Sequence, residues 1–102
     1  MKYEILFTQP AYHDLQLAFD WYENERAGLG WEFRNEIALS LEKINDDRVS
    51  YRAFAGAVRK IPLQRFPYIV YFKKYESKKM IVIAAVLHER RNPEEIRKRI
   101  KG

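Results

Sequence analysis

The sequence contains no cysteine, which excludes disulfide bonds, zinc–thiolate sites and a thiol nucleophile. Its longest apolar run, MIVIAAVL, has eight residues, far fewer than the roughly twenty that a membrane-spanning helix needs. No repeat, low-complexity tract or linker is present. The first ten residues, MKYEILFTQP, carry a charge at Glu4 and no small-residue cleavage site, unlike a signal peptide. We therefore expect no membrane association, and the lack of cysteine fits a reducing, cytoplasmic location.

The residues that are present have the composition of a folded globular protein. Of the 102 residues, 47% are hydrophobic and 32% are charged. This length allows one domain over residues 1–102 with a single modest core. Aromatic residues make up 15% of the chain, which predicts a core or groove built on rings.

Charge is distributed unevenly along the chain. Residues 1–51 contain 5 basic and 10 acidic residues, whereas residues 52–102 contain 14 basic and 4 acidic residues. The basic half is expected to attract an acidic segment, a nucleic acid or an anionic patch. The alternative is that the charge serves only solubility.

The N-terminal half has the periodicity of one strand and two helices. Residues 2–7 alternate as a strand, and Thr8 then predicts the N-cap of a helix. Gly28 and Gly30 predict a tight reversal into a second helix that ends near residues 45–48. Each helix has an apolar stripe at a spacing of three or four residues. The stripes are Tyr12, Leu15, Phe19 and Tyr22, followed by Phe33, Ile37, Leu41 and Ile44.

The C-terminal half has the pattern of an antiparallel meander followed by a helix. Its three β-branched and aromatic runs are AVRKIPL, YIVYFKKY and KMIVIAAVL. Pro62 places the first run at an edge or bulge, and the continuous apolar character of the last predicts a central strand. Asn92 and Pro93 predict a final helix that starts at residue 93. The sequence thus predicts an α+β fold of order β-α-α-β-β-β-α, with a helix hairpin packed on a small antiparallel sheet.

His88, at the end of the predicted central strand, is the first candidate for chemistry. Arg90 and Arg91 follow it within one loop. A histidine can move a proton and arginines can stabilise a phosphate in its transition state, which is what metal-free cleavage of an RNA phosphodiester requires. The alternative is that His88 caps the strand and the arginines are solvated.

Further cations lie along the meander and the C-terminal tail. Arg59 and Arg65 flank the first turn of the meander, with Tyr68 available for stacking, and the four lysines of KKYESKK are interpreted as protection of the sheet edge. The tail, with Arg97 among its cations, either docks as a cap or presents a basic surface to a partner. His13 and the carboxylates of the first helix, Asp14 included, are interpreted as a solvated face. No metal-ligand spacing or phosphate-binding loop is present, so we expect no cofactor.

Four segments together resemble the RelE/ParE superfamily of type II toxin–antitoxin toxins, and within it the ParE-like branch. They are AYHDLQLAFDWYE, GLGWEFRNEI, RKIPLQRFPYIVYF and IVIAAVLHERRNPEEIRKR, in the expected order over most of the chain. The resemblance implies the same order of elements. It also implies a cognate antitoxin whose C-terminal segment folds against the toxin in a hetero-oligomeric complex.

The resemblance implies two alternative targets. ParE-type members poison DNA gyrase by binding, and that is the function we expect here. RelE-type members cut messenger RNA on the ribosome, with His88 and Arg91 as the catalytic residues in this chain. Those relatives place an arginine where this sequence has Tyr68. In either case the residues expected to contact the target are Arg59, Arg65, Tyr68, Arg90, Arg91 and Arg97.

Overall fold

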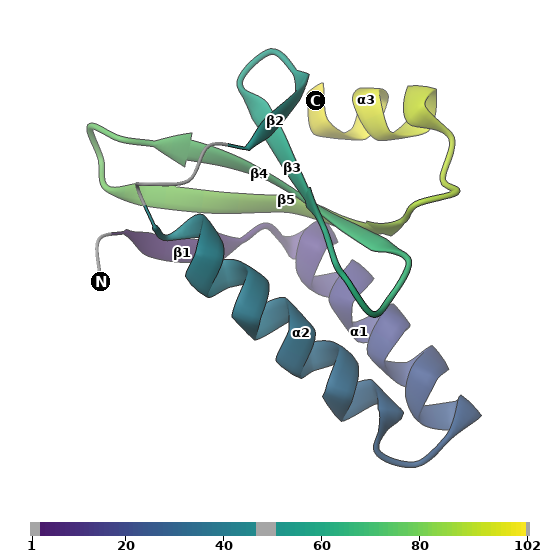
Figure 1. Ribbon diagram of the computed structural model, residues 1–102. Helices are drawn as coiled ribbons and strands as arrows, with labels where there is room; N and C mark the ends of the chain where they lie inside the picture. Colours follow the sequence, from purple (N-terminus) through teal and green to yellow (C-terminus); the bar gives the residue numbers. More distant parts are fainter. Residues whose placement is uncertain (1–2, 47–50, 102) are drawn as a thin grey trace.

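The computed structural model describes residues 3–46 and 51–101 as one sheet with a helix hairpin on one face and a short helix on the other (Figure 1). The elements are β1 (Glu4–Phe7), α1 (Gln9–Glu25), α2 (Leu29–Ile44), β2 (Arg52–Ala55), β3 (Val58–Pro62), β4 (Tyr68–Tyr75), β5 (Met80–His88) and α3 (Pro93–Lys101). The predicted order is confirmed, with one additional strand, β2. The predicted strand over residues 2–7 and the helix end near 45–48 each extend in part outside the described residues.

The sheet has the strand order β1-β5-β4-β3-β2. The meander pairs are antiparallel as predicted, but β1 pairs with β5 in parallel. A parallel pair is possible here because a long connection, which includes the helix hairpin, separates the two strands. Strand β2 was not predicted, because its four residues contain one large apolar side chain, Phe54. Gly56, with a φ of 55°, closes its hairpin with β3.

Two positional predictions for the meander are confirmed. Strand β5 lies between β1 and β4, so it is central. The last partner of β2 on β3 is Lys60, and Pro62 lies two residues beyond it. On that side β3 is therefore an edge at Pro62, and no hydrogen bond between strands is lost because proline lacks an N–H group.

The turn between α1 and α2 is built around Glu23 and two glycines. Gly28 adopts a φ of 93° at the N-terminus of α2, as the sequence predicted for a reversal. The Glu23 carboxylate accepts hydrogen bonds from the backbone N–H groups of Gly28 (2.8 Å) and Gly30 (2.9 Å). A Cβ atom at Gly30 would lie 2.6 Å from the Phe19 carbonyl oxygen, so the hairpin requires glycine there.

The buried stripe of α1 differs from the predicted one. Tyr12 is 54% exposed and Phe19 is only half-buried, so these two predictions are wrong. Small side chains lie in their place and let the helix approach the sheet closely. The buried residues of α1 are Ala11, Asp14, Leu15, Ala18 and Tyr22.

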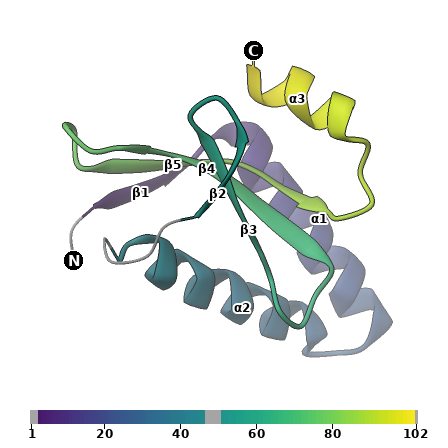
Figure 2. The ribbon, with the colours of Figure 1, turned by 45° about the horizontal axis from the view of Figure 1, so that its top comes forward.

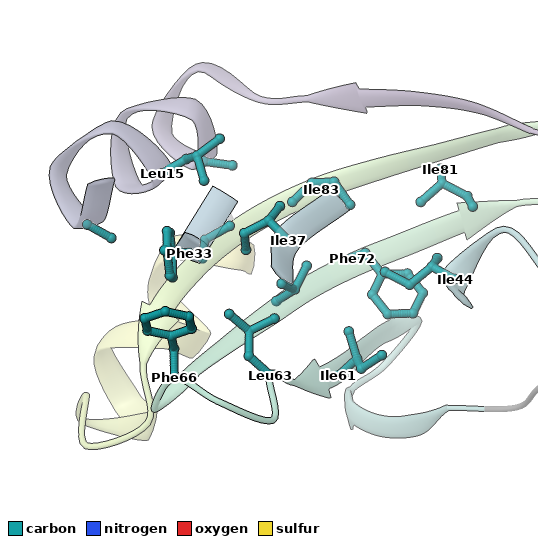
Figure 3. Packing of buried hydrophobic residues seen from close by; sticks show 14 of the residues in the cluster. Leu15, Phe33, Ile37, Ile44, Ile61, Leu63, Phe66, Phe72, Ile81 and Ile83 are labelled. Carbon is teal, nitrogen blue, oxygen red and sulfur yellow. The ribbon is translucent and has the colours of Figure 1, made fainter. Parts of the chain in front are cut away.

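The main core lies between the helix hairpin and the sheet, and a smaller cluster lies under α3 on the opposite face (Figures 1 and 2). Figure 3 shows Phe33 and Ile37 of α2 directed toward Phe66, Leu63 and the strands. Both faces of β5 are thus covered, as its apolar run predicted.

A β-bulge in β5 decides which way the end of that strand faces. Tyr71 pairs with Ala85 and Phe72 pairs with Ile83, so Ala84 has no partner on β4. Beyond the bulge, Val86 joins Ile83 in the core under the helix hairpin. Because alternate residues share a face, His88 is turned toward the hairpin as well.

Candidate functional site

A groove of about 500 Å³, which we name the His88 groove, lies between α1 and the end of β5. Strand β1 pairs with β5 only as far as Phe7 and Ile83. Beyond that point no strand in the described part of the chain pairs with β5 on this side, and α1 forms the opposite wall. The lining residues are Asp14, Leu17, Ala18, Trp21, Tyr68, Val86, Leu87, His88 and Arg91.

Asp14, 9% exposed, ties three elements together at this groove. Its Oδ2 atom accepts a hydrogen bond from the Val86 backbone N–H (3.0 Å), which β1 would otherwise have paired. The same oxygen accepts one from the Arg99 guanidinium of α3 at 2.7 Å. The prediction of a solvated Asp14 was wrong. Its position three residues after Ala11 and four before Ala18, both buried, is the sequence signal that marks it.

His88 lies opposite Tyr68 in the ladder between β4 and β5. The two rings meet edge to face, with centroids 5.4 Å apart. The Nδ1 atom of His88 accepts a hydrogen bond from the Arg90 backbone N–H at 3.1 Å. The neutral ring therefore carries its proton on Nε2. Arg91 N–H donates to the His88 carbonyl at 2.9 Å and closes the turn.

The tyrosine of the groove is held in its neutral form. Burial raises the pKa of Tyr68, the negative charge of Asp14 raises it further, and the positive charge of Arg91 lowers it. Burial is also the main cause that raises the pKa of Tyr22 and Tyr71. These phenols therefore bear no charge near neutral pH.

The raised pKa values predict a loss of stability in alkali. A phenol whose pKa is higher in the folded protein stabilises the fold fully below its unfolded pKa of about 10, and this contribution is lost as the pH rises through the folded value. We expect a lower melting temperature at about pH 11 than at about pH 8, with a smaller fall in Tyr68→Phe than in the unsubstituted protein. Tyr12→Phe, at an exposed side chain, is the matched control. Equal falls in all three proteins would contradict the prediction.

The structure brings together three of the predicted site residues. Tyr68, His88 and Arg91 line the His88 groove. Arg90, which follows His88, is exposed and contributes its backbone N–H to the histidine ring. The guanidinium of Arg91 is also held by Glu95, with 3.2 Å between Nε and Oε1.

The other three predicted residues lie away from this groove. Arg65 contacts Glu32 of α2 at 2.7 Å, and this hydrogen bond lowers the pKa of Glu32. Arg59 lies on β3 between Ala53 of β2 and Phe72 of β4. Arg97 lies on α3, with its guanidinium 5.3 Å from the Phe54 ring centroid.

The His88 groove has the chemistry of a docking site more than that of a phosphate site. One guanidinium, from Arg91, faces it, whereas Asp14 places a carboxylate in its wall that Arg99 already neutralises. Trp21 is 58% exposed and Leu17 is also exposed, which gives the groove an apolar rim. Sequence reasoning did not single out these two residues, because exposure cannot be seen in a periodic pattern.

The described residues contain neither a metal-binding cluster nor a membrane-spanning helix. Within residues 3–46 and 51–101, no group of three or more histidine, aspartate or glutamate side chains is placed to hold a metal ion. In the same part of the chain, no helix is both long and apolar enough to span a membrane.

The sequence and the fold of this chain are similar to those of known proteins. The family model for the ParE toxin of the type II toxin–antitoxin system parDE matches residues 5–93. A chain in the structure of a chromosomal ParDE system from P. aeruginosa has a TM-score of 0.73 at 19% identity, over 85% of this chain and 96% of that one. No curated protein matches the sequence.

RelE toxins share the same fold. The isolated E. coli RelE toxin has a TM-score of 0.56 at 17% identity, over 96% of this chain and 98% of that one. A variant of E. coli RelE in the free state has a TM-score of 0.54 at 15% identity, over 99% and 97%. At these identities the likeness concerns the fold alone.

Proposed function

The chain belongs to the ParE toxin family of type II toxin–antitoxin systems, and from this we propose that it inhibits DNA gyrase by binding it and is neutralised by a cognate antitoxin. Gyrase acts in the cytoplasm, so the toxin acts there too. The basic half of the chain supports capture of an acidic antitoxin segment, because opposite charge steers association.

The observation that carries this proposal is the composition of the His88 groove. Cleavage of a phosphodiester needs cations around the developing charge. Among the described residues that line the groove, Arg91 is the one arginine, while Arg59, Arg65 and Arg97 lie elsewhere. An exposed tryptophan beside an arginine is, by contrast, a frequent pair at protein interfaces. We therefore assign the groove to docking on the target.

A ribosome-dependent nuclease is the second candidate. The observation in its favour is that His88 shares the groove with Tyr68 and Arg91, and its Nε2 atom has no hydrogen-bond partner among the described residues. A histidine with a free Nε2 can transfer a proton. In that mechanism His88 and Arg91 would act as the catalytic pair.

A DNA supercoiling assay tests the proposal directly. Purified gyrase, relaxed plasmid and ATP are incubated with increasing toxin, and we expect supercoiling to stop. In parallel, primer extension on a message in a purified translation reaction tests the second candidate. New message ends within translated codons, with supercoiling intact, would replace the gyrase proposal with the nuclease.

Charge reversal at Arg91 is expected to weaken the inhibition of gyrase. Arg91→Glu should raise the toxin concentration for half-inhibition about tenfold, equivalent to about 1.4 kcal/mol of binding free energy. Lys78→Glu, at an exposed lysine in the turn between β4 and β5, makes the same change of net charge. If both variants lost affinity equally, overall charge rather than the groove would be responsible.

Truncation of His88 separates docking from catalysis. A docking histidine contributes affinity, so His88→Ala should inhibit supercoiling completely at a concentration a few times higher. A catalytic proton shuttle would instead lose about 10²- to 10⁴-fold in rate, and added protein would not restore full activity. Complete supercoiling-inhibition curves and rates of message cleavage, both measured for the unsubstituted protein and for His88→Ala, distinguish the two outcomes.

A further inference from the structure

A second groove lies between α2 and the connection from β3 to β4. It has a volume of about 370 Å³, within the range of sites that bind small molecules. Figures 1 and 2 both show this connection beside α2. Pro62 and Gln64 line the groove from the connection, and Ser40 is among the residues that line it from α2. We name it the Ser40 groove.

The wall opposite α2 is anchored from below. Leu63 and Phe66, on either side of the exposed part of the connection, are buried in the main core (Figure 3). Arg65, between them, contacts Glu32 of α2 with 2.7 Å between Nη2 and Oε1. These contacts fix the connection next to the helix. The groove is therefore formed before a ligand binds, which lowers the cost of binding.

Ser40 is the residue of this groove that the fold does not explain. It is 6% exposed, yet its hydroxyl forms no hydrogen bond within residues 3–46 and 51–101. Every fully buried polar side-chain atom in that part of the chain has a partner, so the hydroxyl is accessible from the groove. Alanine would occupy the same space and favours a helix more than serine does. The hydroxyl is thus available to a ligand and serves no contact of the fold.

The charge of the groove is negative. Glu36, Glu42 and Asp46 contribute three carboxylates, against one ammonium group from Lys43. Glu36 lies four residues before Ser40, so its carboxylate and the hydroxyl are neighbours on one face of α2. Neither Glu36 nor Glu42 forms an ion pair with another described residue. The groove therefore favours a cation.

Apolar groups beside these carboxylates indicate what kind of cation fits. Leu39 is 45% exposed, and it lines the groove together with the exposed ring of Pro62. A metal ion would gain nothing from them, whereas the methylene groups of an alkylamine would bury apolar area there. Aliphatic amines carry a positive charge near neutral pH, as the lysine side chain does. Three carboxylates suit a ligand with two or more ammonium groups.

We propose that the Ser40 groove binds an aliphatic polyamine. One ammonium group lies at the Glu36 carboxylate and donates a hydrogen bond to the Ser40 hydroxyl, and the methylene chain lies on Leu39 and Pro62. This site is separate from the His88 groove. The proposal does not depend on gyrase inhibition, so the two proposals can fail independently.

Nuclear magnetic resonance titration with spermidine tests the proposal. We expect saturable shifts of the backbone amide signals of Leu39, Ser40 and Gln64. The melting temperature should rise with spermidine, because a ligand that binds the folded state stabilises it. Ser40→Ala should weaken binding about tenfold, since a hydrogen bond to a charged group is lost. Glu36→Gln should weaken it about threefold, as expected for one exposed charge pair.

Matched variants in the turn between β4 and β5 distinguish the groove from general charge. Ser77→Ala and Glu76→Gln make the same chemical changes at exposed residues outside the groove, so spermidine binding should be unchanged. Equal losses in the groove variants and the turn variants would overturn the proposal. So would Mg²⁺ that shifted the same amide signals at the same concentration, because the groove would then attract any cation.

A single ammonium group tests whether the ligand is a free polyamine. Nα-acetyl-lysine methylamide presents one lysine side chain with the backbone groups of a protein. We expect it to bind more weakly than spermidine, because fewer of the carboxylates are paired. Equal affinity for the two compounds would overturn the assignment to a polyamine and assign the groove to a lysine side chain of a partner protein.

Discussion

Asp14→Ala is expected to lower the free energy of unfolding by about 3 kcal/mol. The substitution removes the acceptor for the Val86 backbone N–H and the partner of Arg99 in one step. A buried N–H left without an acceptor costs about 1–3 kcal/mol. The lost ion pair adds to this, since Asp14 is 9% and the Arg99 side chain 25% exposed. Urea unfolding followed by circular dichroism measures the change.

Two further variants separate the contributions of Asp14. Asp14→Asn keeps an oxygen for the Val86 N–H but loses the negative charge, so we expect about half the loss of Asp14→Ala. Arg99→Ala leaves Asp14 with its backbone donor and should cost about 2 kcal/mol. A double-mutant cycle of Asp14→Ala with Arg99→Ala gives the coupling between the two side chains.

The outcome of this cycle also bears on the His88 groove. Asp14 lines the groove and holds α3 through Arg99. Most substitutions at exposed positions change the free energy of unfolding by less than about 0.5 kcal/mol. If Asp14→Ala did the same, the carboxylate would not hold α1, β5 and α3 together. The groove would then depend on apolar packing alone.

The helices and strands with strong periodicity could be predicted from the sequence. Leu15 and Tyr22 of α1 are buried as their spacing indicates, and Phe33, Ile37 and Ile44 do the same for α2. These signals suffice because a helix buries one continuous stripe. The prediction that Tyr12 is buried was wrong because aromatic residues count as apolar in a periodic pattern. The small buried side chains of Ala11 and Ala18 instead allow α1 to approach the sheet closely.

The candidate site could be predicted only in part, because tertiary contacts assemble it. His88, Tyr68 and Arg91 are near one another through the pairing of β4 with β5. Arg65 was expected to contact the target together with Tyr68 and Arg91, yet it lies away from them and Glu32 holds it against α2. Such a long-range pair leaves no local signature in the sequence.

The bulge at Ala84 is the feature that sequence reasoning had no means to find. MIVIAAVLH is almost uniformly apolar, so its alternation does not show which residues face the helix hairpin. One extra residue in β5 exchanges the two faces from Ala85 onward. Without it His88 would face α3 rather than the groove. Small side chains at residues 84 and 85 are compatible with a bulge but do not specify one.

Phe33→Ala should have the largest effect on stability, a loss of about 3–5 kcal/mol. Phe33 is 0% exposed and lies at the centre of an aromatic cluster under the helix hairpin, next to Phe66 (Figure 3). Its ring centroid is 5.4 Å from that of Tyr22, 5.3 Å from that of Phe66 and 5.2 Å from that of Tyr68. Truncation removes these contacts and leaves a cavity.

Phe33→Ala is also expected to disturb the His88 groove, because the Phe33 ring packs against Tyr68, which lines that groove. A domain of this size has a total stability of roughly 5–15 kcal/mol, so the variant is expected to fold at low temperature. Thermal unfolding gives its melting temperature, and supercoiling inhibition should be measured well below that temperature. Phe33→Leu keeps an apolar side chain and leaves a smaller cavity, so it should cost less than Phe33→Ala. Leu39→Ala, at an exposed position of the same helix, should cost less than about 1 kcal/mol. A Phe33→Ala protein as stable as Leu39→Ala would mean that the cluster closes around the cavity. A Phe33→Leu protein that remains folded but no longer inhibits gyrase would indicate that the effect acts through Tyr68. Among the described residues, Phe33 is the α2 side chain whose ring contacts Tyr68.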